Sequence, residues 1–101
     1  MTDTRLEHDL LGDREVPAEA YYGVHTLRAQ ENFQISGITI ATMPELIVAL
    51  ASVKAAAAKA NAELGLLPQA QCDAIVAACA EIRSGALHDQ FVVDVIQGGA
   101  G

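Results

Sequence analysis

Apolar residues recur at three- and four-residue spacing in two consecutive segments, which predicts two helices. The first segment runs from Thr42 to about Leu64, and its stripe is Leu46, Leu50, Val53, Ala57, Ala60 and Leu64. The second runs from about Gln69 to Arg83, with Cys72, Ile75, Val76, Cys79 and Ile82 on one face. Gly65 is placed to end the first helix and Pro68 follows shortly, so we expect an antiparallel helical hairpin.

The start of the first helix carries a possible capping box, Thr42-Met43-Pro44-Glu45. In such a box the Thr42 hydroxyl accepts a hydrogen bond from the Glu45 amide, while the Glu45 carboxylate reaches back. Pro44 is compatible with this position because first-turn amides have no partner within the helix. The run Ala55 to Ala58 has two interpretations: small residues that let neighbouring helices approach closely, or simple helix propensity.

The N-terminal third has a weaker pattern. Residues 5–16 alternate loosely around Leu11-Gly12-Asp13, which predicts a short irregular hairpin or an extended arm closed by Pro17. Residues 18–31 repeat apolar side chains at helical spacing, with Gly23 weakening the pattern by about 1 kcal/mol relative to alanine. Residues 33–41 are β-branched around Gly37 and predict an extended connection or a brief strand.

Near the C-terminus, Phe91 to Ile96 is a short β-type run that leads directly into Gln97-Gly98-Gly99-Ala100-Gly101. Glycine-rich turns expose backbone N–H groups and can hold anions when a helix follows, although the signal of one such turn is weak. The predicted fold class is therefore mainly α with short β segments.

The composition allows one domain at most, because the chain has 101 residues. Hydrophobic residues make up 51% and aromatic residues only 4%, and nineteen residues are alanine. A core of small methyl groups buries little area per residue. This composition favours one piece of a larger helical assembly over a self-sufficient domain.

The charge of −7 excludes several partners. Six basic residues are scattered along the chain, whereas nucleic-acid or anionic-membrane binding requires them clustered. The longest apolar segment, residues 46–67, is interrupted by Lys54, Lys59, Asn61 and Glu63, which argues against a membrane span. The first nine residues contain no apolar stretch of the kind that secretory signals carry.

Cys72 and Cys79 lie two helical turns apart, or roughly 10 Å, beyond disulfide reach. We expect them to be small buried residues of a reduced, cytoplasmic protein. His8, His25 and His88 share no short ligand spacing, so the sequence predicts no metal site.

Several stretches, in order, resemble the N-terminal signature of the aspartate ammonia-lyase (aspartase) family, within the aspartase/fumarase superfamily. They are residues 10–18, residues 20–29, Glu31-Asn32-Phe33 with Ile35-Ser36, Val53-Lys54 with the alanine run, and residues 91–101. Class II fumarase is the alternative. Fumarases generally have a tryptophan at the position of Tyr22 and a threonine-glycine-serine-glycine turn where this chain has Gly98-Gly99-Ala100-Gly101. Both differences favour aspartase.

The resemblance implies that residues 1–101 are the first, N-terminal domain portion of a homotetrameric lyase, truncated before its central helical bundle. Such a lyase reversibly eliminates ammonia from L-aspartate to give fumarate and needs no organic cofactor. Gln97, Gly98, Gly99 and Gly101 would shape its first substrate-lining loop. The family's catalytic serine lies in a loop outside these residues, so no catalytic residue is assigned here and the fragment is expected to be inactive alone. A divalent metal activates some members, but no residue here resembles its site.

Other residues favour structural roles. Arg28 is expected to be a solvated charge, His25 and His88 surface or packing residues, and Tyr21 and Tyr22 packing residues with a polar tip. A non-enzymatic helical oligomerisation module is a further alternative. The alanine-rich hairpin and the lack of catalytic residues motivate it.

Overall fold

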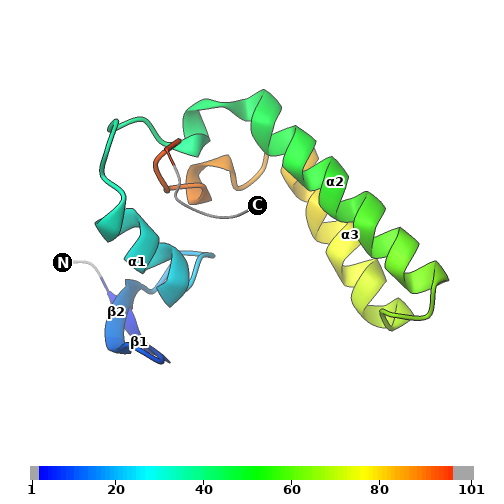
Figure 1. Ribbon diagram of the computed structural model, residues 1–101, viewed down its shortest axis with the longest axis horizontal. Coiled ribbons are helices and arrows are strands. Elements are labelled where there is room, and N and C mark those ends of the chain that lie inside the picture. The colour runs from blue at the N-terminus through cyan, green and yellow to red at the C-terminus, as the bar shows by residue number, and fades with distance from the viewer. Residues whose placement is uncertain (1–2, 97–101) are drawn as a thin grey trace. The chain divides into compact units, whose positions relative to one another are not determined.

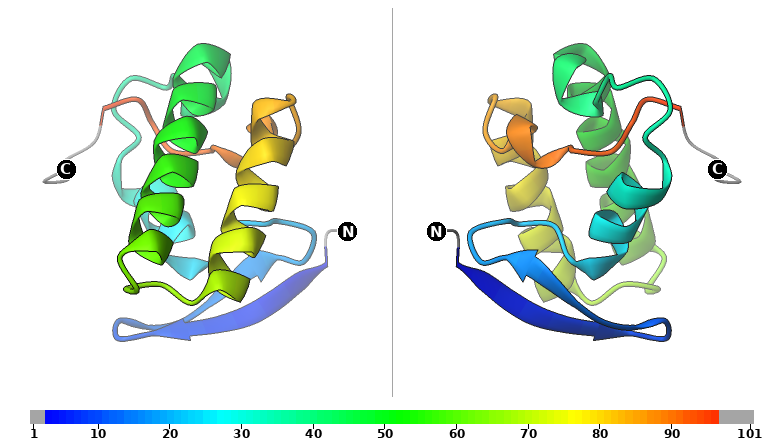
Figure 2. Two further views of the ribbon diagram at one scale, coloured as in Figure 1. Left: turned by 90° about the vertical axis from the view of Figure 1, so that its right-hand side faces the viewer. Right: turned by 90° about the vertical axis from the view of Figure 1, so that its left-hand side faces the viewer.

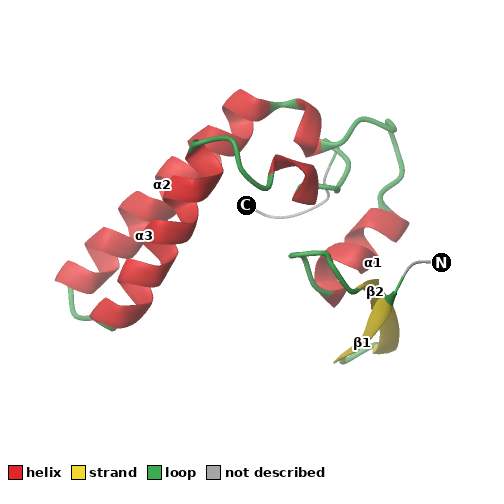
Figure 3. Ribbon diagram, turned by 180° about the vertical axis from the view of Figure 1, so that it is seen from behind, coloured by secondary structure: helices red, strands yellow, loops and turns green. Residues whose placement is uncertain are grey.

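The computed structural model describes residues 3–96, which divide into two compact units (Figure 1). One unit contains the described residues up to 40 together with residues 89–96, and the other contains residues 41–88. In chain order the elements are β1 (Thr4–Asp9), β2 (Gly12–Pro17), α1 (Val24–Asn32), η1 (Ile40–Thr42), α2 (Pro44–Glu63), α3 (Gln69–Arg83) and η2 (His88–Gln90). Helices predominate and the two strands are short (Figure 3), so the predicted fold class is confirmed.

The N-terminal hairpin is more regular than expected. Strands β1 and β2 pair antiparallel over their full length, from Thr4 opposite Pro17 to Asp9 opposite Gly12. Gly12 has a φ of 117°, as in hairpin turns whose last residue takes a positive φ so that the strands keep their twist. The Asp9 carboxylate further holds the turn by accepting a hydrogen bond from the Leu11 amide at 3.0 Å.

Helix α1 begins at Val24, so the helix expected from residue 18 is wrong for its first six residues. Gly23, expected inside the helix, is instead its N-cap. The Arg5 guanidinium explains the difference, because it binds backbone carbonyl oxygens of this segment and holds it in an irregular path. Those carbonyls belong to Pro17, Ala18, Ala20 and Tyr22.

Helices α2 and α3 form the predicted antiparallel hairpin (Figure 2). Gly65 follows α2 with a φ of 74°. Its amide donates to the Ala62 carbonyl at 3.1 Å, and the Leu66 amide donates to the Asn61 carbonyl at 2.9 Å. These two bonds make a Schellman motif, which only glycine enters without strain. The predicted helix end at Gly65 is confirmed.

The predicted capping box at the start of α2 is wrong. Met43, and not Thr42, is the N-cap, and the Met43 side chain makes no capping hydrogen bond. Thr42 is the last residue of the short 3-10 helix η1. A capping box requires its first residue to lie outside a helix, so Thr42 does not meet this condition. Pro44 then opens α2, where its missing N–H costs nothing.

The predicted buried face of α2 is also wrong, by one or two positions along the helix. The buried residues of α2 are Ile47, Ala51, Ala55 and Ala58. Leu50 and Val53 of the expected stripe are instead 46% and 65% exposed. Small residues permit α3 to lie close, and Ala51 and Ala55 form a core cluster with Cys79, against which Ile82 packs. Of the alanine run, Ala55 and Ala58 are buried, which supports the interpretation that small residues let a neighbouring helix approach closely. Ala56 and Ala57 are exposed.

On α3 the expected face is largely correct. Cys72 and Cys79 are buried free thiols, as predicted. Val76 and Ile82 are half-buried, and Ile75 lies at the exposed margin. The buried face of α3 therefore follows its sequence pattern.

The β-type run at residues 91–96 does not form a strand. It makes a single antiparallel bridge, Thr39 with Asp94. The Ile40 amide donates to the Val93 carbonyl at 3.0 Å, and the Val95 amide donates to the Ile38 carbonyl at 2.9 Å. Pairing stops there because Gly37 turns the chain with a φ of 76° and η1 begins at Ile40. The extended connection or brief strand expected over residues 33–41 is therefore only partly correct: the segment bends at residues 35–37, Thr39 makes the bridge, and Ile40 and Ala41 belong to η1.

Candidate functional site

A buried carboxylate lies just before the glycine-rich segment. Asp94 is 6% exposed, and both of its oxygens accept hydrogen bonds. Oδ2 accepts from the amides of Ser36 and Gly37, each at 2.9 Å. Oδ1 accepts from the Ser36 hydroxyl at 2.9 Å and from the Ile96 amide at 2.8 Å. Within residues 3–96, four donors therefore converge on this side chain.

These donors hold Asp94 in its charged form. Their hydrogen bonds lower the pKa of Asp94 to about 2. The bond from the Ile96 amide is the largest cause, followed by those from the hydroxyl and amide of Ser36 and from the amide of Gly37. Burial acts in the opposite direction and raises the pKa. A carboxylate with so low a pKa is a poor proton acceptor at neutral pH. Asp94 is suited to holding backbone in place.

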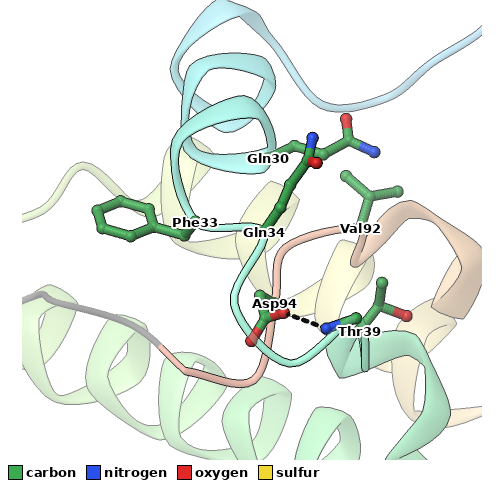
Figure 4. Close-up of a pocket in the computed structure, with 7 residues that line it drawn as sticks. Gln30, Phe33, Gln34, Thr39, Val92 and Asp94 are labelled. Atoms are coloured by element: carbon green, nitrogen blue, oxygen red, sulfur yellow. Dashed lines mark hydrogen bonds between the residues drawn. The ribbon is translucent and has the colours of Figure 1, made fainter.

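A cavity of about 250 Å³ opens beside Asp94 (Figure 4). Its lining residues are Gln30, Phe33, Gln34, Gly37, Thr39, Val92 and Asp94. In Figure 4 the Gln30 and Gln34 side chains extend toward each other, whereas Phe33 points away from the group. Apart from Asp94, the lining side chains are neutral, so this cavity offers mainly hydrogen-bonding groups.

A second polar cluster holds β1 to the segment that enters α1, and no pattern in the sequence indicates it. The Arg5 guanidinium donates to the Glu7 carboxylate at 2.7 Å as well as to four backbone carbonyls. Glu7 Oε1 in turn accepts from the Val24 amide at 2.9 Å. Arg5 is the first cause of a lowered pKa at Glu7, and the Val24 amide is the second. Glu7 thereby caps α1 from a neighbouring strand, because the N-cap residue Gly23 has no side-chain oxygen.

Arg28 is not the solvated charge that was expected. Its side chain is 16% exposed, and it forms two hydrogen bonds to Asp9, at 2.8 and 2.9 Å, and one to the Gly12 carbonyl at 3.0 Å. This pairing lowers the pKa of Asp9 and raises the pKa of Arg28. The arginine ties α1 to the hairpin turn, and Arg14 adds an exposed ion pair to Glu31.

Each of the three histidines lies near one polar partner. His8 Nδ1 is 2.6 Å from the Asp13 carboxylate, and His25, whose side chain is 88% exposed, is 3.8 Å from Asp9. His88 Nε2 lies 2.8 Å from the Ile82 carbonyl oxygen. Across residues 3–96, no three histidine, cysteine or acidic side chains group closely enough to hold a metal ion. Tyr21, expected to pack, is exposed, whereas Tyr22 is half-buried.

The residues predicted to shape a substrate loop, Gln97, Gly98, Gly99 and Gly101, lie outside the described residues. The described chain ends one residue earlier, at Ile96, whose amide Asp94 binds. A single acidic residue between Val93 and Val95 is a signal that sequence reasoning could have used, because a charge in an apolar run requires buried partners.

Comparison with known proteins decides the family. The model of a family described as "Lyase" matches residues 12–101. The chain belongs to this lyase family. Its curated relatives include aspartate ammonia-lyase of Pseudomonas aeruginosa, 56% identical over 101 residues, covering all of this chain and 21% of the relative. Aspartate ammonia-lyase of Escherichia coli K12 is 58% identical over 98 residues, covering 96% of this chain and 20% of the relative.

Solved structures agree with the fold. A fumarate lyase:delta crystallin from Brucella melitensis, bound to cobalt, superposes with a TM-score of 0.90 at 55% identity, covering 98% of this lyase-family chain and 22% of that one. A class II fumarase from Schistosoma mansoni gives 0.84 at 34% identity, covering 94% and 20% respectively. The resemblance to aspartate ammonia-lyases is therefore confirmed, and the likeness to fumarase is more distant. The chain spans about a fifth of the length of the curated relatives it matches.

No helix within residues 3–96 is long and apolar enough to cross a membrane.

Proposed function

We propose that these 101 residues are the N-terminal portion of an aspartate ammonia-lyase, which reversibly eliminates ammonia from L-aspartate to give fumarate. One observation carries this proposal: eight relatives with that name are 54–59% identical to the chain over nearly all of its length. The named fumarase is only 34% identical.

The chain contributes a scaffold and one edge of the substrate site. Removing the Cβ proton of aspartate places extra negative charge next to a carboxylate, so preorganised donors must surround that carboxylate. We propose that Gln97, Gly98, Gly99 and Gly101 line the substrate there. The base comes from the remainder of the longer protein.

Three of the described carboxylates support the proposal that the base comes from elsewhere in the longer protein. Asp94, Glu7 and Asp9 all have lowered pKa values because hydrogen-bond donors hold their charged forms. A carboxylate stabilised in this way accepts a carbon-bound proton poorly. We therefore expect the 101-residue chain alone to form no fumarate.

The exposed apolar face of α2 favours a larger, assembled protein. Exposed large apolar side chains include Leu46, Leu50 and Val53 of α2 and Leu64, which follows this helix. Contiguous apolar surface of this kind usually meets other protein. We propose that the intact enzyme is a cytoplasmic homotetramer and that this face is covered in it.

The experiment compares two substrates with the full-length protein. Purified protein is given L-aspartate or L-malate, and fumarate is followed by its ultraviolet absorbance. The proposal expects fumarate from L-aspartate and little or none from L-malate. Fumarate from L-malate alone would instead identify a class II fumarase. Fumarate from neither would favour a non-enzymatic helical oligomerisation module.

A further inference from the structure

We propose that Asp94 is a positioning residue that sets where the substrate loop Gln97–Gly101 leaves the scaffold. The inference rests on the proposed function, because it assumes that this loop lines the aspartate site. It assigns to Asp94 a role in substrate binding that acts through the backbone and involves no contact with substrate.

The first step is the bond between Asp94 and Ile96. A side-chain oxygen that accepts from the amide two residues later closes an Asx turn, which fixes the direction of the backbone. Here the distance from Asp94 Oδ1 to the Ile96 nitrogen is 2.8 Å. Ile96 is the residue immediately before Gln97. The turn therefore determines the direction in which the chain enters the loop.

The second step is what holds Asp94 itself. The amides of Ser36 and Gly37 and the Ser36 hydroxyl donate to the carboxylate from a segment almost sixty residues away in sequence, at 2.9 Å each. The neighbouring backbone bonds from Ile40 to Val93 and from Val95 to Ile38 fix the residues on both sides of Asp94. The carboxylate thus links a fixed frame to the last residue before the loop.

The third step is that only a carboxylate satisfies this arrangement. The four described groups that bond to Asp94 are all donors, and each oxygen accepts two of these bonds. An asparagine amide has one oxygen. If that oxygen faces the amides of Ser36 and Gly37, the Ser36 hydroxyl can rotate and accept from the new NH₂ group. Of the four described donors, the Ile96 amide is then the one that loses its partner. The opposite orientation leaves two backbone amides unpaired. Asp94→Asn should therefore release the Ile96 amide selectively.

A loop that starts in the wrong direction misplaces its substrate contacts, and displacements of about 1 Å can cost roughly 100-fold in rate. In the full-length protein we expect Asp94→Asn to lower kcat/KM for L-aspartate by about 10- to 100-fold, with KM rising about tenfold. Asp89→Asn is the matched control, because it makes the same chemical change at an exposed aspartate in η2. It should keep KM within about twofold.

The KM is the deciding readout. Partial unfolding removes active enzyme and lowers the maximal rate, but it leaves the KM of the folded molecules unchanged. A KM within twofold of the unsubstituted value for Asp94→Asn would overturn the proposal, whatever happens to the maximal rate.

If Asp94→Asn does not fold, Asp94→Ser and Asp94→Ala replace it, because a serine hydroxyl can still accept from the Ile96 amide. The serine variant should then have the lower KM, and equal values would overturn the proposal. An unsubstituted protein without activity on L-aspartate would overturn the proposed function first, and this proposal with it.

Discussion

Replacing Ala55 by leucine should destabilise the helical hairpin, whereas the same replacement at Ala56 should not. Ala55 is buried in the seam between α2 and α3, where it forms a cluster with Ala51 and Cys79. Ala56 is the next residue along the same helix and is exposed. The two variants therefore differ in where the added atoms point and in little else.

The expected magnitude follows from the seam. Leucine adds three carbon atoms to a position that is 8% exposed, against a neighbouring helix. Inserting extra methylenes into a packed core costs about 1–3 kcal/mol. For a chain of this length that corresponds to a fall in Tm of roughly 5–20 °C. At Ala56 the change in the free energy of unfolding should stay within about 0.5 kcal/mol, because leucine and alanine have similar helix propensities.

The assay is unfolding of the 101-residue chain by urea and by heat, followed by far-ultraviolet circular dichroism, which reports mainly on the helices. Light scattering at the same concentration checks that neither variant changes its association state. Equal destabilisation by both variants, or a larger effect at Ala56, would refute the assignment of the buried face.

Three other predictions test the scaffold. Gly65→Ala should lower the free energy of unfolding by about 1 kcal/mol in urea titrations, because alanine is strained at a φ of 74°. The space around the new methyl group is open, so strain is the only expected cost. An unchanged urea midpoint would contradict the Schellman motif at the end of α2. Arg5→Lys should lower the Tm measurably despite keeping the charge, since an ammonium cannot reach the five acceptors that the guanidinium fork binds, and a Tm equal to that of the unsubstituted chain would count against this cluster. The urea midpoint should be constant above about pH 5 and fall toward pH 2. The pKa values of Glu7, Asp9 and Asp94 are lowered in the folded chain, that of Asp94 to about 2. As the pH falls through this range the unfolded chain binds more protons than the folded chain, so the folded chain loses stability. A midpoint that does not change between pH 5 and pH 2 would contradict these shifts.

The helical hairpin was predictable because its connection is marked by backbone chemistry. Gly65 takes the positive φ that ends α2, and Pro68 is the N-cap of α3. Neither feature depends on distant residues. The start of α2 was not predictable in this way, because η1 shifts its N-cap from Thr42 to Met43.

The buried face of α2 was mispredicted because hydrophobicity ranks leucine and valine above alanine. In this chain the alanines face α3, while Leu50 and Val53 are exposed. Under the proposed function both faces of α2 are buried in the intact enzyme, so the sequence pattern reflects contacts beyond these 101 residues. Close packing against a neighbouring helix selects small side chains, which a hydrophobic pattern does not distinguish.

The candidate site shows a similar limit. Gln97–Gly101 was assigned through family resemblance and remains a prediction. The role of Asp94 emerged only from the structure, since its partners Ser36 and Gly37 are distant in sequence. Arg5 could not be foreseen at all, because most of its acceptors are backbone carbonyls, which every residue carries.

The most direct test compares the 101-residue chain with the full-length protein at equal molar concentration, both supplied with L-aspartate. Both samples are purified from a host that lacks its own aspartate ammonia-lyase, and fumarate is measured by ultraviolet absorbance. The account predicts steady fumarate formation by the full-length protein and none above background by the chain alone. Turnover that scales with the concentration of the 101-residue chain, or a full-length protein that forms no fumarate from L-aspartate, would contradict it.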